Sequence, residues 1–169
     1  MLKFRSMKVG NCTNAHREYL AGLIRSEKHS DGNCKKPMTK RDNLNSLIPY
    51  GKVFRGLCLD ELPQLINVIC GEMSLIGPRP PVIYEVEEYQ RWHNGRFDTM
   101  PGITGLWQVN GKNRLTFEQM VRLDIRYSRQ ESFWVDIIII LKTPFAIISN
   151  ASYHRKEDKN IAKGTYKYA

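Results

Sequence analysis

Two adjacent carboxylates, Asp60 and Glu61, are the residues whose type and spacing best suit catalysis in this sequence. The apolar residues that follow recur at i, i+3, i+4 and i+7, which predicts a short helix with a buried face made of Leu62, Leu65, Ile66 and Ile69. Pro63 suits the first turn of that helix, where a missing N–H costs nothing. The two acids would then lie at a helix N-terminus, which also attracts bound anions. A simpler interpretation is that Asp60 only caps the helix.

Two arginines could reach an anion held beside these acids. Arg55 precedes Asp60 by five residues, and a guanidinium so placed could bind the anion that the helix N-terminus attracts. Arg79 is flanked by prolines on both sides, which lowers the entropy cost of aiming its side chain. The alternative for Arg79 is an exposed loop arginine without a function.

A third carboxylate, Asp124, lies on the apolar side of a helix that is expected to start at the capping-box pattern Thr116–Gln119. A carboxylate on a buried face needs a cation or hydrogen-bond donors. Asp124 is therefore either half of a structural ion pair or part of the site.

The remaining patterns predict short strands over residues 2–9, 73–76 and 106–109, and helices over 14–28, 84–96 and 132–148. The last helix is too interrupted by charge to span a bilayer and too apolar for an ordinary surface helix. It is expected to lie at a membrane interface or to pack under another element, and Pro144 should bend or end it. The expected fold class is α/β, a helix-rich single domain with a small sheet and interfacial amphipathic helices.

Length and charge narrow the class of protein. The 169 residues suit one domain, expected over residues 1–150, with a basic tail over 151–169. The net charge of +9 lies at the two ends, because residues 42–150 carry eleven Lys/Arg against twelve Asp/Glu. This distribution argues against a nucleic-acid-binding module and favours a membrane surface or a phosphorylated substrate. The four cysteines have no CxxC spacing and no nearby His pair, so a zinc site is not expected.

Taken together, the motifs resemble a known family. They are Lys3-Phe4-Arg5-Ser6-Met7, Arg55, Asp60-Glu61-Leu62-Pro63-Gln64-Leu65, Met73-Ser74-Leu75-Ile76-Gly77-Pro78-Arg79-Pro80, Pro101-Gly102-Ile103-Thr104-Gly105-Leu106-Trp107-Gln108-Val109 and Leu123-Asp124-Ile125-Arg126-Tyr127. In this order and spacing they resemble the bacterial sugar transferases, the monotopic phosphoglycosyl transferases that begin exopolysaccharide, O-antigen or glycoprotein glycan assembly. Several ordered motifs are more specific than any one of them, so the resemblance favours a catalytic Asp60 over a cap.

The resemblance implies transfer of a sugar 1-phosphate from a UDP-sugar to undecaprenyl phosphate, with release of UMP. Asp60 matches the family's nucleophile, which would form a covalent aspartyl-phosphosugar intermediate. Glu61 would help to hold Mg²⁺ or position the attacking group, so Asp60 and Glu61 are the expected metal ligands. The residues expected to bind phosphate or the nucleotide sugar are Lys3, Arg55, Arg79, Lys112, Asp124 and Asp136.

Two departures from the family pattern affect these expectations. Lys112 stands where many relatives carry Arg, so a phosphate contact there would lack the bidentate fork. Relatives also have a basic cluster and a hydrophobic re-entrant helix before the Lys3 motif, so this chain is expected to be an N-terminally truncated member. The implied location is the cytoplasmic face of the bacterial inner membrane, as a peripheral or monotopic protein. The alternative hypothesis is an inactive fragment that binds a membrane or a partner protein.

Overall fold

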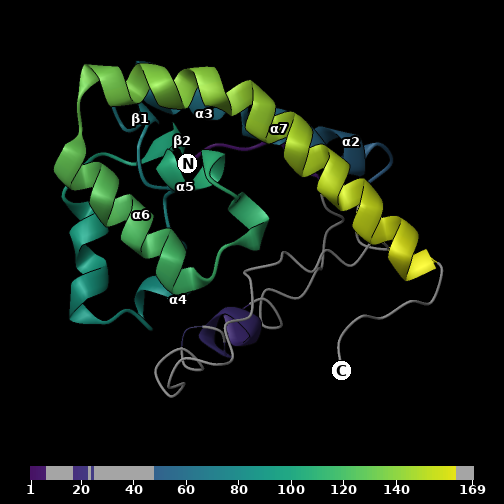
Figure 1. Ribbon diagram of the computed structural model, residues 1–169, viewed down its shortest axis with the longest axis horizontal. Coiled ribbons are helices and arrows are strands. Elements are labelled where there is room, and N and C mark those ends of the chain that lie inside the picture. The colour runs from purple at the N-terminus through teal and green to yellow at the C-terminus, as the bar shows by residue number, and fades with distance from the viewer. Residues whose placement is uncertain (7–16, 23, 25–47, 163–169) are drawn as a thin grey trace.

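The computed structural model describes residues 1–6, 17–22, 24 and 48–162, and Figure 1 shows their arrangement. Helices α6 (Phe117–Gln130) and α7 (Phe133–Ala162) form two sides of an angle that encloses a small sheet and α5 (Leu106–Val109). The other elements are α2 (Gly51–Gly56), η2 (Leu59–Glu61), α3 (Gln64–Ile69), α4 (Ile83–Val86), η3 (Arg91–Phe97) and η4 (Lys112–Arg114). The expected helix-rich α/β fold with a small sheet is confirmed, and the interfacial role of its helices stays a prediction.

The sheet is a parallel pair made of β1 (Ser74–Ile76) and β2 (Gly102–Thr104), and it confirms the strand expected at 73–76. Gly102, the first residue of β2, must be a glycine. A Cβ at this position would lie 2.1 Å from the backbone nitrogen of Gly77, which follows β1. This close approach lets the Gly102 N–H donate to the Pro78 carbonyl at 2.9 Å. The loop that carries Arg79 therefore leaves the sheet from a fixed backbone position.

The main core lies where α6 packs against α5 and η3. Helix α6 starts at the expected capping box, in which the Gln119 N–H donates to Thr116 Oγ1 at 3.2 Å and the Thr116 N–H donates to Gln119 Oε1 at 3.0 Å. Its apolar stripe is buried as the pattern predicts. The two core clusters are Ile24, Trp107, Phe117, Met120 and Val121, and Ile76, Tyr127 and Ile139.

The short helix after the acid pair buries the opposite face to the predicted one. Its expected core residues are exposed, at 50%, 43%, 54% and 85% for Leu62, Leu65, Ile66 and Ile69. The buried side chains of α3 are Gln64 and Asn67. Asn67 is satisfied there, because its Oδ1 accepts the Leu2 N–H at 2.9 Å and its Nδ2 donates to Glu72. The two amide side chains thus take the interior side, and the apolar side faces outward.

Three other local expectations are wrong. Residues 106–109 form α5 instead of a strand. The neighbouring side chains of Trp107 and Gln108 are both buried, whereas in a strand they would point to opposite faces. Residues 84–96 form α4 and then η3, because Gln90 opens a second element with a capping box to His93. Of the strand expected over residues 2–9, residues 2–6 form neither a strand nor a helix, and residues 7–9 lie outside the described residues. In the segment expected to be a helix over 14–28, residues 17–22 are helical and most of the others lie outside the described residues.

Helix α7 continues through Pro144 and bends along its length (Figure 1). A proline inside a helix removes one backbone hydrogen bond and crowds the preceding turn, which explains the bend. Large apolar side chains of α7 that remain exposed are Phe133, Trp134, Ile138, Ile140, Leu141, Phe145 and Ile148. None of the helices in the described part of the chain has the apolar length that crossing a bilayer requires.

Arg96 links α4, η3 and α6 inside the protein. Arg96 Nη2 lies 2.7 Å from Asp124 Oδ2, and both side chains are 1% exposed. Arg96 Nη1 donates to the Tyr89 hydroxyl at 2.6 Å and to Glu85 Oε1 at 3.4 Å. Burial raises the pKa of Asp124 to about 7, while the charge of Arg96 opposes this increase. Of the two interpretations of Asp124, the structure supports the structural ion pair.

Replacing Arg96 with Met should lower the free energy of unfolding by about 3 kcal/mol at pH 8, because the buried carboxylate of Asp124 then loses the positive charge that offsets its burial. Urea unfolding measures the change. Arg129→Met, at an exposed position, is the control and should stay within about 0.5 kcal/mol of the parent. Equal midpoints for Arg96→Met and the parent would contradict this role.

Candidate functional site

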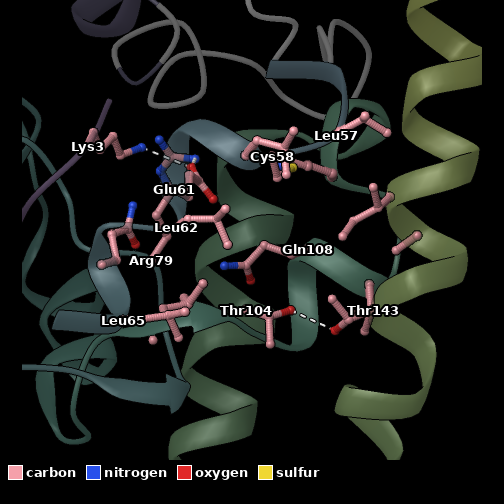
Figure 2. Close-up of a pocket in the computed structure, with 18 of the residues that line it drawn as sticks. Lys3, Leu57, Cys58, Glu61, Leu62, Leu65, Arg79, Thr104, Gln108 and Thr143 are labelled. Atoms are coloured by element: carbon pink, nitrogen blue, oxygen red, sulfur yellow. Dashed lines mark hydrogen bonds and ion pairs between the residues drawn. The ribbon is translucent and has the colours of Figure 1, made fainter. Parts of the chain in front are cut away.

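A pocket of about 220 Å³ lies between the acid pair, the Arg79 loop, β2, α5 and α7 (Figure 2). Its charged residues are Lys3, Glu61, Arg79 and Lys112, and the rest of the lining includes Leu62, Gln64, Leu65, Thr104, Gln108, Thr143 and Ile147. Half of the site residues expected from the sequence therefore meet in one place, although they come from segments far apart in the chain.

Glu61 is the centre of the charged part of the pocket. Its Oε1 accepts a hydrogen bond from Lys3 Nζ at 2.9 Å and lies 3.7 Å from Arg79 Nη1. Burial alone would raise the pKa of Glu61, but the charges of Lys3, Arg79 and Lys112 outweigh it and lower the pKa to about 2. Burial and the neighbouring Arg79 lower the pKa of Lys3, against the attraction of Glu61. Three cations facing one carboxylate make this part of the pocket attractive to an anion.

Pro63 explains why the two acids are not part of α3. A proline has no N–H to donate to the preceding turn, so the chain forms the separate η2 turn and α3 begins at Gln64. The Asp60 carbonyl instead accepts the Phe4 N–H at 3.0 Å. Asp60 caps neither element, because the N-cap positions belong to Cys58 and Pro63. The interpretation of Asp60 as only an N-cap is therefore wrong.

Backbone contacts hold the two cations nearest to Glu61. The Leu2 N–H bonds to Asn67 on the inner side of α3, which together with the Phe4 contact fixes the extended segment that carries Lys3. Arg96 Nη2 donates to the Arg79 carbonyl at 3.0 Å. The Arg79 loop is thus tied to the buried Arg96.

Lys112 enters the pocket from η4. Its Nζ donates to Cys58 Sγ at 3.5 Å, and its charge contributes to the lowered pKa of Glu61. Cys58 itself has a positive φ of 56°, a left-handed conformation that few side chains adopt. It turns the chain from α2 into the acid pair.

The other expected site residues do not line the pocket. Asp60 is half-buried next to Glu61, and its charge acts on the pKa of Lys3. Arg55 lies at the end of α2. Asp124 pairs with Arg96 in the core. Asp136 accepts the Tyr127 hydroxyl at 2.8 Å and joins α7 to α6.

Sequence reasoning did not select several polar pocket residues, namely Cys58, Gln64, Thr104, Gln108 and Thr143. Gln64 and Gln108 lie inside two of the quoted motifs, but a glutamine has no charge that would mark it as a site residue. The available signal for Gln108 was its place beside Trp107 between two Pro/Gly turns. The expected strand there would have placed these neighbours on opposite faces.

The arrangement can bind a phosphorylated ligand and bring a carboxylate to it. Among the residues that the structure describes, no three His, Cys, Asp or Glu side chains converge as a metal site. Magnesium, however, is commonly held by one or two carboxylates together with substrate phosphates and waters. Asp60 and Glu61 supply two such carboxylates, and the contacts of Glu61 to Lys3 and Arg79 both use Oε1. This donor set fits a magnesium ion that binds together with a phosphorylated substrate.

Comparison with known proteins agrees with this chemistry. A family model described as bacterial sugar transferase matches residues 1–150. The galactosyl transferase CpsE of Streptococcus agalactiae is 39% identical over 142 residues, which make up 83% of this chain and 29% of that protein. The undecaprenyl-phosphate galactose phosphotransferase of Salmonella typhimurium is 38% identical over 148 residues, 86% of this chain and 29% of that protein.

The UDP-galactose-lipid carrier transferase of Erwinia amylovora is 40% identical over 142 residues, 84% of this chain and 28% of that protein. The chain therefore spans less than a third of the length of these three relatives.

The lowered pKa of Glu61 predicts a pH-dependent contribution to stability. Its ionised form is favoured in the folded state, so the contribution is present above about pH 4.5 and is lost as pH falls toward 2. Glu61→Gln should therefore lose about 1–3 kcal/mol relative to the parent at pH 6, and this difference should shrink toward pH 2.

Urea unfolding at several pH values measures this difference. The control is Glu118→Gln, which removes an exposed pair with Arg122 and should cost no more than about 0.5 kcal/mol. A difference between Glu61→Gln and the parent that does not change with pH would show that the three cations do not act on Glu61 as described.

Proposed function

Because the chain belongs to the bacterial sugar transferase family, we propose that it transfers a sugar 1-phosphate from a UDP-sugar to undecaprenyl phosphate as the first step of glycan assembly. The observation that carries the proposal is the pocket in which Lys3, Arg79 and Lys112 surround Glu61 beside Asp60. Its charges suit a diphosphate, and relatives named for UDP-galactose and undecaprenyl phosphate support the two substrates.

In the proposed reaction a carboxylate oxygen of Asp60 attacks the phosphorus that bears the sugar. A P–O bond to the aspartate forms, the bond between the two phosphates breaks, and UMP leaves with the electron pair. A phosphate oxygen of undecaprenyl phosphate then attacks the same phosphorus. The acyl-phosphate bond breaks, the aspartate carboxylate returns, and a lipid-linked diphosphate sugar is formed.

The cations of the pocket have a defined task in both steps. The attacking group and the diphosphate are anionic, so positive charge must offset their repulsion. Lys3, Arg79 and Lys112 are held around Glu61 before substrate binds, which avoids reorganisation during the reaction. Asp60 and Glu61 would hold magnesium, which when bound supplies further charge neutralisation at the phosphates. The pairing with Lys3 keeps the Glu61 carboxylate ionised.

The surroundings of the pocket suit a lipid acceptor. Leu62 and Leu65 line it on one side, and Ala146 and Ile147 of α7 line it on another. Exposed apolar side chains continue from both, since Ile69 of α3 is 85% exposed and Phe145 of α7 is 76% exposed. Such surfaces favour a membrane interface. The proposed location is the cytoplasmic face of the inner membrane, where nucleotide sugars are available.

Asp60→Asn should lower UMP release from a UDP-sugar by about three orders of magnitude, because an amide cannot act as the nucleophile. The assay uses the purified full chain in detergent with undecaprenyl phosphate, magnesium, and UDP-galactose or UDP-glucose. Asp98→Asn is the matched control and should keep the parent rate. Parent-like UMP release by Asp60→Asn would contradict the nucleophile assignment. Vesicle binding by a parent that releases no UMP would favour the inactive membrane-binding alternative.

Ile69→Asp should weaken binding to anionic vesicles about 10-fold, because it replaces an exposed apolar contact on α3 with a charge. Vesicle co-sedimentation measures the change. The matched control is Ile83→Asp. Ile83 is 82% exposed and lies on α4, which Figure 1 shows near the lower end of α6 and away from α3. Equal losses for the two variants would argue against α3 as a membrane-facing surface.

A further inference from the structure

The amide of Gln108 is a pocket group that the proposed steps leave without a role. Gln108 is 8% exposed and lines the pocket, and Figure 2 shows its side chain pointing into the middle of it. Its Oε1 is buried and accepts no hydrogen bond from any described residue. Buried polar atoms are nearly always paired, and leaving one unpaired is costly. The unpaired Oε1 of Gln108 therefore suits a ligand that carries a hydrogen-bond donor.

The backbone around β2 fixes the place of this oxygen. A Cβ on Gly105 would lie 2.7 Å from Gln108 Oε1 and 2.2 Å from the Gly77 carbonyl oxygen. The absence of a side chain at Gly105 thus allows the amide to lie against the backbone next to Thr104. The position of the acceptor follows from the same close packing that joins the two strands.

Thr104 presents a second acceptor in the same pocket. Its Oγ1 lies 2.9 Å from Thr143 Oγ1, and Thr143 donates its only hydroxyl proton to the Ile139 carbonyl at 2.8 Å. Thr104 must therefore be the donor in the contact between the two threonines. With its proton used in this way, Thr104 can offer a ligand only the lone pairs of its oxygen.

We infer that Gln108 and Thr104 bind hydroxyl groups of the donor sugar, an inference that rests on the proposed function. Ionised phosphates carry no donors and uracil carries a single imide N–H, so the hydroxyl donors of the nucleotide are the two on its ribose, which UDP alone also carries. A hexose carries several hydroxyls, which can donate to two acceptors at once. With the diphosphate bound among Lys3, Arg79 and Lys112, the sugar attached to it enters the part of the pocket lined by Gln108 and Thr104.

Gln108→Met tests this, because methionine keeps the length of the side chain and removes the acceptor. Calorimetric titration of the full chain in detergent compares UDP-galactose, UDP-glucose and UDP. We expect Gln108→Met to bind the UDP-sugar preferred by the parent about 10-fold more weakly, and to bind UDP within about 2-fold of the parent. Gln130→Met, at an exposed position on α6, is the matched control and should change neither affinity.

Thr104→Val gives an independent test and should show the same pattern. If Gln108→Met does not fold by circular dichroism, Thr104→Val and analogues of the preferred UDP-sugar that lack one hydroxyl decide the question with folded protein. At least one analogue should bind the parent about 10-fold more weakly. Equal losses for UDP and the UDP-sugar would assign these residues to the nucleotide and overturn the inference. Unchanged affinities would also overturn it. A parent that binds no UDP-sugar would refute the proposed function as well, which the parent titration shows separately.

Discussion

The buried pair of Arg96 and Asp124 is the constraint on which the position of the charged pocket depends. Arg96 lies 2.7 Å from Asp124 and donates to the Arg79 carbonyl at 3.0 Å. Both partners are 1% exposed, so the Arg79 loop is tied to the core and not to a mobile surface group. An aspartate outside the pocket thereby fixes a cation inside it. A buried pair of this kind is costly to break, which favours one arrangement of the loop.

The second constraint is the proline that separates the acid pair from α3. Because Pro63 cannot donate, Asp60 and Glu61 lie in their own turn, and the Asp60 carbonyl is available to the Phe4 N–H. That contact brings the N-terminal segment, and with it Lys3, to Glu61. Backbone hydrogen bonds therefore position the cations around Glu61. Their combined charge lowers the pKa of Glu61 to about 2.

Helix starts and apolar periodicity could be predicted from the sequence more reliably than which side of a helix is buried. The capping box and apolar stripe of α6 were predictable because a single long helix dominates its own pattern. The outward face of α3 was not, since periodicity shows that a face is apolar but not whether protein covers it; here Gln64 and Asn67 take the interior. Glu61 and Arg79 were selected from their charge and their neighbours in the sequence, and Lys3 and Lys112 from the family resemblance. Gln108 was missed because its significance depends on an unpaired oxygen, which only the three-dimensional packing reveals.

The measurement that tests the account most directly is intact-mass analysis of the full chain incubated with its UDP-sugar in the absence of a lipid acceptor, followed by peptide mapping. The account predicts an added phosphosugar on Asp60 that disappears when undecaprenyl phosphate is supplied. A protein that turns over substrates without forming this adduct, or that carries it on another residue, would contradict the account.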